Sequence, residues 1–177
     1  QGLDTITKKT FYEFTKKIKK HLTKIDLPGS FRESHELFQT IMDVEITISL
    51  KREYEEYKGL LNPLITERIV RGKNISGFEY LDAKKKSEKI KTALMEFFEH
   101  FDAIIAPTIN GRANFENDLR SLCFSDFFAI HEFPILSLPL LKMGNSLPYG
   151  IQLVGAPGDD GRLIRTATWL VENYGGS

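Results

Sequence analysis

Cysteine and tryptophan are nearly absent from this sequence, and neither sign of charge is in excess. The single cysteine, Cys123, excludes an internal disulfide and fits a reducing compartment. No apolar run approaches the roughly 20 residues that a membrane-spanning helix needs, and no secretory apolar region stands at the start. We therefore expect a cytoplasmic protein that has no membrane partner.

The charges balance, with 24 lysines and arginines against 24 acidic residues. This balance argues against a dedicated nucleic-acid binder, which usually carries a basic excess. Lysines do gather near the start, where phosphate or acidic lipid is an alternative partner. We interpret them as a solvated helix face, because no aromatic residues accompany them. These lysines are Lys8, Lys9, Lys16, Lys17, Lys19, Lys20 and Lys24.

Metal-ligand spacing is also missing. The four histidines show no such spacing with one another or with Cys123, so we expect no metal and no other cofactor. Cys123 and His131 are eight residues apart and could share a helix face as a thiol–imidazole pair. We favour a buried structural cysteine instead, because no third group is evident to orient the imidazole.

The composition, with 41% hydrophobic and 27% charged residues, predicts one globular domain over 1–177. Residues 1–101 read as mainly helical, because apolar residues recur there at a spacing of three to four. Predicted helices cover about 4–27, 33–57, 61–72 and 76–101, and a stripe through Leu37, Ile41, Val44 and Ile48 marks the second. Ser76 and Glu79 match a capping box that opens the fourth.

The period changes after Asp102. Three short apolar runs, at 103–108, 133–140 and 149–155, are bounded by Pro, Gly and Asn and predict strands. A last helix begins near Asp160, with Asp159 or Asp160 as its cap. Residues 102–177 thus form the strand and helix portion of an α/β fold, in which helices are layered on a mixed, mostly buried sheet. Gln152 is a polar residue within the third strand, so its amide requires partners.

Three motifs in this order resemble the C-terminal part of the amidase signature family. An aspartate precedes an apolar strand that ends in Pro-Thr (102–108), a Pro-x-x-Ser-x-Pro strand follows (134–139), and then a Leu-Pro-x-Gly-x-Gln-Leu strand (147–155). The segments 68–86 and 22–31 are similar to earlier parts of the family. The resemblance implies the C-terminal part of the amidase signature fold.

The family hydrolyses or transfers carboxamide groups with two serines and a lysine in a Gly/Ser-rich setting. The resemblance implies that one serine is the nucleophile, the second relays a proton and the lysine is the general base. This sequence has no Gly-Gly-Ser-Ser-Gly segment. We therefore expect an amidase portion that carries no catalytic residue and is inactive alone, and whose partner is the N-terminal catalytic half.

The resemblance also places candidate substrate contacts, for a small-molecule amide, after the Pro-Thr strand and before the second strand. By position these are Thr108, Ile109, Ser125, Asp126, Phe127, Phe128 and His131. The family often has Gly two residues before Pro134, and Glu132 stands there in this chain. Ser137, within the second strand, is interpreted as structural.

Two alternatives to a general amidase remain open. The amidase-like component of a glutamyl- or aspartyl-tRNA amidotransferase would act on glutamine for tRNA-dependent amidation, and tRNA would then be a partner; otherwise we expect no nucleic acid. A non-catalytic binding or assembly module is the other. A sheet without its remaining strands would also expose an apolar edge, so a homodimer is a further expectation.

Overall fold

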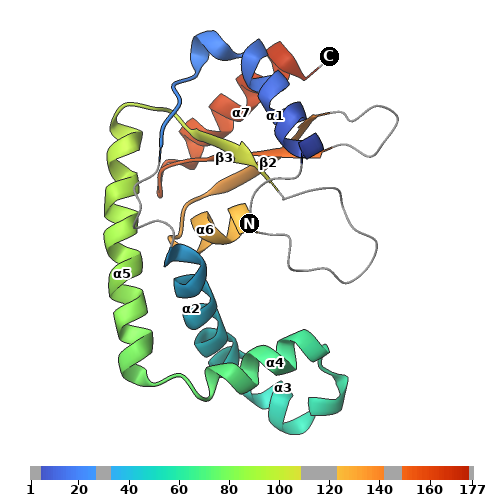
Figure 1. Ribbon diagram of the computed structural model, residues 1–177, viewed down its shortest axis with the longest axis vertical. Coiled ribbons are helices and arrows are strands. Elements are labelled where there is room, and N and C mark those ends of the chain that lie inside the picture. The colour runs from blue at the N-terminus through green and yellow to red at the C-terminus, as the bar shows by residue number, and fades with distance from the viewer. Residues whose placement is uncertain (1–4, 27–32, 109–122, 142–148, 176–177) are drawn as a thin grey trace. The chain divides into compact units, whose positions relative to one another are not determined.

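The computed structural model describes residues 5–26, 33–108, 123–141 and 149–175 (Figure 1). Short 3₁₀ turns are labelled η. In chain order the elements are α1 (Thr5–Lys17), η1 (Lys19–His21), α2 (Ser34–Ser49), α3 (Lys51–Glu56), η3 (Lys58–Leu60), α4 (Pro63–Gly72), α5 (Gly77–Met95), η4 (Glu96–Glu99), β1 (Ile104–Pro107), α6 (Cys123–Ile130), β2 (Ile135–Leu141), β3 (Tyr149–Val154) and α7 (Asp160–Tyr174).

The chain divides into two compact units. Unit 1 comprises residues 1–28 and 93–177, and unit 2 comprises residues 29–92, so the division falls within α5. Each unit is described by itself below. The single domain expected over 1–177 stays a prediction.

In its described residues, unit 1 is built on a three-stranded sheet in the order β1-β3-β2. Both pairings are antiparallel: Ala106 and Ser137 lie opposite Gln152 from either side. The two outer strands therefore run parallel to each other on either side of β3. The three apolar runs of the sequence thus lie side by side, and the predicted α/β class, with helices on a sheet, is confirmed.

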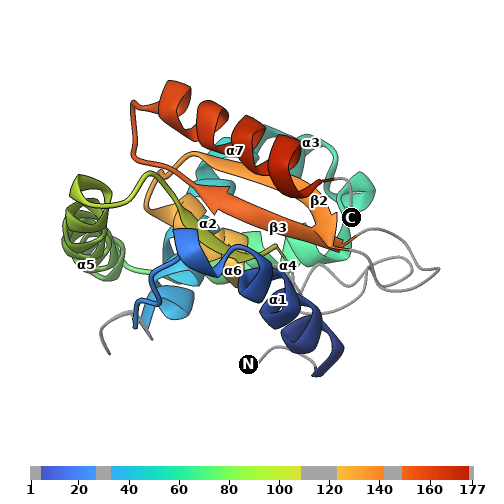
Figure 2. The ribbon, with the colours of Figure 1, turned by 90° about the horizontal axis from the view of Figure 1, so that it is seen from above.

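Helices α1 and α7 cover one face of this sheet, and α6 lies on the other (Figures 1 and 2). Strand residues alternate between faces, so Ile151 and Leu153 point toward α1 and α7. Phe14 and Ile18 from α1 and Leu163 from α7 pack on them in one buried cluster. Burying each such side chain stabilises the fold by about 1.5–3 kcal/mol.

The first helix is shorter than predicted. It ends at Lys17, η1 follows, and Leu22 is already extended, with φ −115° and ψ 137°. Thr23 and Ile25 are β-branched, which disfavours continued helix. The last helix begins as expected: the Asp159 side chain accepts a hydrogen bond from the backbone N–H of Arg162.

Unit 2 is helical in its described residues. The predicted helix over 33–57 is two helices, because the chain turns at Leu50 between α2 and α3. The predicted stripe is also partly wrong: Leu37 and Ile41 are buried, but Ile48 is 69% exposed. The capping box is confirmed, since Glu79 accepts from the Ser76 backbone N–H at 2.8 Å while Ser76 Oγ accepts from the Glu79 N–H at 3.1 Å.

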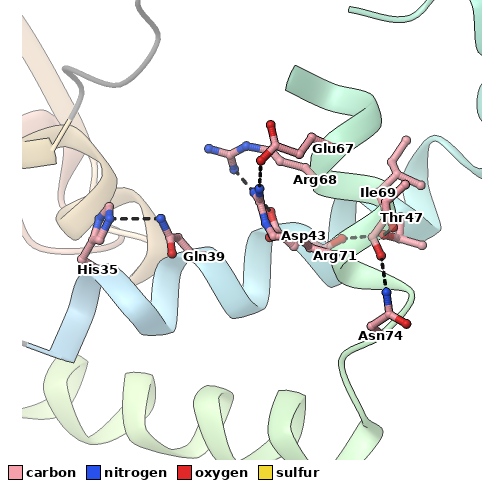
Figure 3. Close-up of polar contacts among 10 residues, drawn as sticks. His35, Gln39, Asp43, Thr47, Glu67, Arg68, Ile69, Arg71 and Asn74 are labelled. Carbon is pink, nitrogen blue, oxygen red and sulfur yellow. Dashed lines mark hydrogen bonds and ion pairs between the residues drawn. The ribbon is translucent and has the colours of Figure 1, made fainter. Parts of the chain in front are cut away.

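An ion pair with a buried carboxylate and a half-exposed arginine joins α2 to α4 (Figure 3). The Asp43 carboxylate is 3% exposed and accepts two hydrogen bonds from Arg71, of 2.7 and 3.3 Å, while Arg68 lies 3.8 Å away. Hydrogen bonding to Asp43 raises the pKa of Arg71. The helices approach closely at Gly72, where a Cβ would collide with the backbone of Asp43 and the hydroxyl of Thr47.

Within the described residues, no helix combines the length and the apolar character needed to cross a membrane.

Candidate functional site

The face of the sheet beneath α6 carries a small polar cluster. Gln152, in the middle of β3, is fully buried, and its Oε1 accepts a 3.1 Å hydrogen bond from the hydroxyl of Ser125 on α6. Ser125 Oγ also lies 3.4 Å from the carbonyl oxygen of Thr108. The Gln152 Nε2 atom has no hydrogen-bond partner in the described part of the chain. Because its Oε1 accepts from the Ser125 hydroxyl, Gln152 holds Ser125 against the middle strand of the sheet.

Thr108 and Ser137 meet over Gly150, two residues before Gln152 on the same face. The Thr108 backbone N–H donates to the Gly150 carbonyl at 3.2 Å, which extends the pairing of β1 by one residue. The two hydroxyl oxygens are 3.4 Å apart. A Cβ at Gly150 would stand 2.7 Å from Thr108 Oγ1 and 2.9 Å from Ser137 Oγ, so only glycine permits this close approach.

Aromatic rings line the following part of α6. Phe127 contacts Phe128 and His131 edge to face, with ring centroids 4.8 and 5.3 Å apart. Phe128 and His131 are buried, whereas Phe127 and Asp126 are half-buried. The helix therefore presents a hydroxyl to the polar cluster and an aromatic group beside it.

The turn after α6 holds Glu132 in the left-handed region, with φ 59°. Its N–H donates to the Ala129 carbonyl and the Phe133 N–H donates to the Phe128 carbonyl, which is the Schellman arrangement at a helix end. Glycine is the usual residue at this position because it has no Cβ penalty. Glu132 thus holds a backbone conformation that glycine adopts more readily.

Within the described residues, the three hydroxyls of this cluster have no activating base. Those of Ser125, Thr108 and Ser137 contact one another, the Gln152 amide or a backbone carbonyl, and none bonds a histidine, lysine or carboxylate in the described residues. A serine hydroxyl needs a base to become a nucleophile. The cluster can therefore donate and accept hydrogen bonds, as a site for a carbonyl or amide group requires.

The structure brings some of the predicted contact residues together. Thr108 and Ser125 meet at the polar cluster, and Phe127, Phe128 and His131 form the adjoining aromatic group. Asp126 lies on α6 between these groups in sequence, and Ile109 lies outside the described residues. Contact of these residues with a substrate stays a prediction.

Sequence reasoning missed the pairing of Gln152 with Ser125 and the burial of Asp43. A polar glutamine within an apolar strand indicated that its amide needs a partner. The sequence did not show that this partner is Ser125, which is 27 residues away. Among the described residues, no group of three or more His, Cys, Asp or Glu side chains could hold a metal ion.

Unit 2 has a separate shallow hollow. Its volume is about 260 Å³, and it is lined by Thr47, Ile48, Lys51, Tyr54, Glu55, Ile69 and Lys73. The Lys73 ammonium stands 4.1 Å from the centre of the Tyr54 ring. This contact places a charge over an aromatic face but assembles no reactive pair.

No family model matches the chain. Over 102 residues it is 34% identical to a glutamyl-tRNA(Gln) amidotransferase component of Desulforamulus reducens, an alignment that covers 53% of this chain and 21% of that protein. A crystal structure of an amidase superposes with a TM-score of 0.84 at 19% identity and covers 97% of this chain and 43% of the other. The structure of a bacterial aryl acylamidase of the amidase signature family superposes with a TM-score of 0.77 at 14% identity. This superposition covers 97% of this chain and 41% of the other.

The chain thus spans about a fifth of the Desulforamulus reducens protein and about two fifths of the two solved structures. The resemblance to amidase signature enzymes that the three motifs indicated is confirmed in both sequence and fold.

Proposed function

We propose, from this resemblance to amidase signature enzymes, that the chain is the C-terminal portion of an amidase that hydrolyses carboxamide C–N bonds. The two serines and the lysine of the reaction would belong to an N-terminal half outside this sequence. Support comes from the fold, since nearly the whole chain matches about two fifths of an amidase. It also comes from the hydroxyls of Thr108, Ser125 and Ser137, which have no base beside them among the residues that the structure describes. The chain by itself would then be inactive.

In this proposal unit 1 supplies one wall of the substrate pocket. Thr108 and Ser125 would bind the amide or carbonyl group of a small-molecule substrate, because the Ser125 hydroxyl lies 3.4 Å from the Thr108 carbonyl oxygen at the end of β1. The half-buried ring of Phe127 would line an apolar part of the same wall. The remaining proposed contacts are Ile109, Asp126, Phe128 and His131.

The test compares the chain alone with the chain fused to the polypeptide encoded upstream of it. We expect ammonia release from simple carboxamides by the fusion only, and its loss when the serine of a Gly/Ser-rich segment is changed to Ala. Thr108→Val should raise KM more than it lowers kcat, since it removes a binding hydroxyl. Turnover by the chain alone would overturn the proposal.

The amidase-like component of a tRNA-dependent amidotransferase is the second candidate, favoured by the identity to the Desulforamulus reducens protein. Ammonia release from glutamine in preference to simple amides, and stimulation by tRNA, would select it over a general amidase. If neither substrate is turned over by the fusion, the non-catalytic binding or assembly module becomes the better description.

The outer strands support the need for a partner. In the described residues β1 and β2 each pair on one side only, with β3. Unpaired strand edges are sites of association. We expect the isolated chain to dimerise, or to bind its N-terminal half, in the cytoplasm. A monodisperse monomer in light scattering at high concentration would contradict this expectation.

A further inference from the structure

The outer surface of α1 and η1 carries a concentration of positive charge. Residues 5–26 contain seven lysines against two carboxylates, whereas the whole chain balances 24 against 24. All seven lysines are exposed. We call the six between α1 and η1 the lysine surface: Lys8, Lys9, Lys16, Lys17, Lys19 and Lys20.

These charges are not neutralised by neighbours. The seventh lysine, Lys24, pairs with Asp26 at 3.3 Å, but no carboxylate of the described residues lies within ion-pair distance of the lysine surface. The stability of the helix does not explain the positions of all these lysines either. Lysines favour the C-terminal turn of a helix, but Lys8 and Lys9 lie in the N-terminal half of α1, whose first turn holds no acidic residue.

An aromatic ring lies among the lysines, contrary to the sequence-based expectation. Tyr12 is 59% exposed, and the Lys16 ammonium stands 4.5 Å from the centre of its ring. Tyr12 is four residues from both Lys8 and Lys16, so the three side chains follow one line along the helix. Lysines that flank an exposed ring are a typical arrangement for binding phosphates and stacking a base.

A second aromatic group lies next to η1. His21, at the end of η1, contacts Trp169 of α7 edge to face, with ring centroids 4.8 Å apart. Trp169 is 38% exposed and is the one tryptophan of the sequence. Its fluorescence therefore reports on this edge of the surface.

A membrane fits this helix less well than a nucleic acid. An interfacial helix inserts its apolar face among lipids. The apolar face of α1 is already used, because Phe14 and Ile18 are buried in the core beneath it. What α1 leaves for a partner is mainly ammonium groups and the Tyr12 ring, with Ile6, 49% exposed, in its first turn.

We propose that the lysine surface, with Tyr12, binds single-stranded nucleic acid through its phosphates and one stacked base. Contacts with phosphates carry no sequence information directly, and one ring can stack on any base, so the binding is independent of sequence. Nonspecific binding of this kind has dissociation constants of about 10⁻⁴ to 10⁻⁶ M at physiological salt.

The test uses the full 177-residue chain and a fluorescein-labelled oligouridylate of about 20 nucleotides. Anisotropy and Trp169 fluorescence are followed over a salt series. Lys9→Gln/Lys16→Gln should weaken binding about tenfold at low salt and reduce the salt slope by about 1.4, which corresponds to two phosphate contacts. The matched control, Lys85→Gln/Lys89→Gln, removes the same charge from exposed positions of α5 and should change neither value.

The stacking part is tested with Tyr12→Ala, which should weaken binding, and Tyr12→Phe, which should not. Tyr57→Ala, at a position 50% exposed, is the control, and circular dichroism establishes that each variant is folded. Equal losses in the two lysine pairs would overturn the proposal. So would binding to phosphatidylserine vesicles without binding to the oligouridylate, which would assign the surface to a membrane. Equal affinity for duplex DNA, with no effect of Tyr12→Ala, would overturn the single-strand assignment.

Discussion

The Ser125 hydroxyl donates a 3.1 Å hydrogen bond to Oε1 of the fully buried Gln152 and so links α6 to the middle strand of the sheet. Removing the donor leaves a buried acceptor without a partner. Ser125→Ala should therefore lower the free energy of unfolding by about 1–3 kcal/mol in urea titrations.

A substitution at Gln152, the other partner of this hydrogen bond, should lower the free energy of unfolding by less. Gln152→Met replaces the amide with an apolar group of similar length, and Ser125 retains the Thr108 carbonyl at 3.4 Å. The double variant Ser125→Ala/Gln152→Met removes both partners of this hydrogen bond. We expect it to be more stable than Ser125→Ala alone, because the buried Gln152 acceptor is no longer left without a donor. A double variant whose losses are strictly additive would show that the two groups do not interact.

Two of the arginine ion pairs in unit 2, Arg71 with Asp43 and Arg52 with Glu56, should differ greatly in strength. Arg71→Met leaves the Asp43 carboxylate buried, with Arg68 3.8 Å away, and should cost about 3 kcal/mol of unfolding free energy. Arg52→Met breaks an exposed i,i+4 pair with Glu56 and should cost less than about 0.5 kcal/mol. Thermal or urea unfolding measures both. Similar losses would mean that Asp43 reaches water when its partner is removed.

Backbone strain at Glu132 predicts a stabilising substitution. Its φ of 59° suits glycine better than a residue with a Cβ. Glu132→Gly and Glu132→Ala both remove the carboxylate, so their difference isolates the backbone effect. We expect the Gly variant to be about 1 kcal/mol more stable than the Ala variant. Equal stability would indicate that the turn rearranges.

The capping box predicts a dependence of stability on pH. Hydrogen bonds from Ser76 lower the pKa of Glu79 below its ordinary value of 4.5. A carboxyl group whose folded-state pKa is lowered stabilises the fold above its unfolded pKa, and this contribution is lost as the pH falls through the folded value. Glu79→Gln keeps an acceptor but does not titrate. The stability difference between the wild type and this variant should therefore be constant near neutral pH and shrink below 4.5. A difference that does not change with pH would rule out the coupling.

Local sequence signals located many elements of this fold. The capping box at Ser76, the cap at Asp159 and the strand that ends at Pro107 each depend on residues a few positions apart, so their pattern is visible in the chain. The break between α2 and α3 at Leu50 was missed, because no proline or glycine marks it.

The sequence by itself determined which segments are helices or strands and which family they resemble, because these follow from periodicity, capping residues and motif order. Only the tertiary structure decided the order of the strands, the burial of Asp43 against Arg71 and the placing of Ser125 on Gln152. Partners 27 or 28 residues apart in the chain meet only when packing brings them together, and the free energy of burying a polar group depends on that meeting.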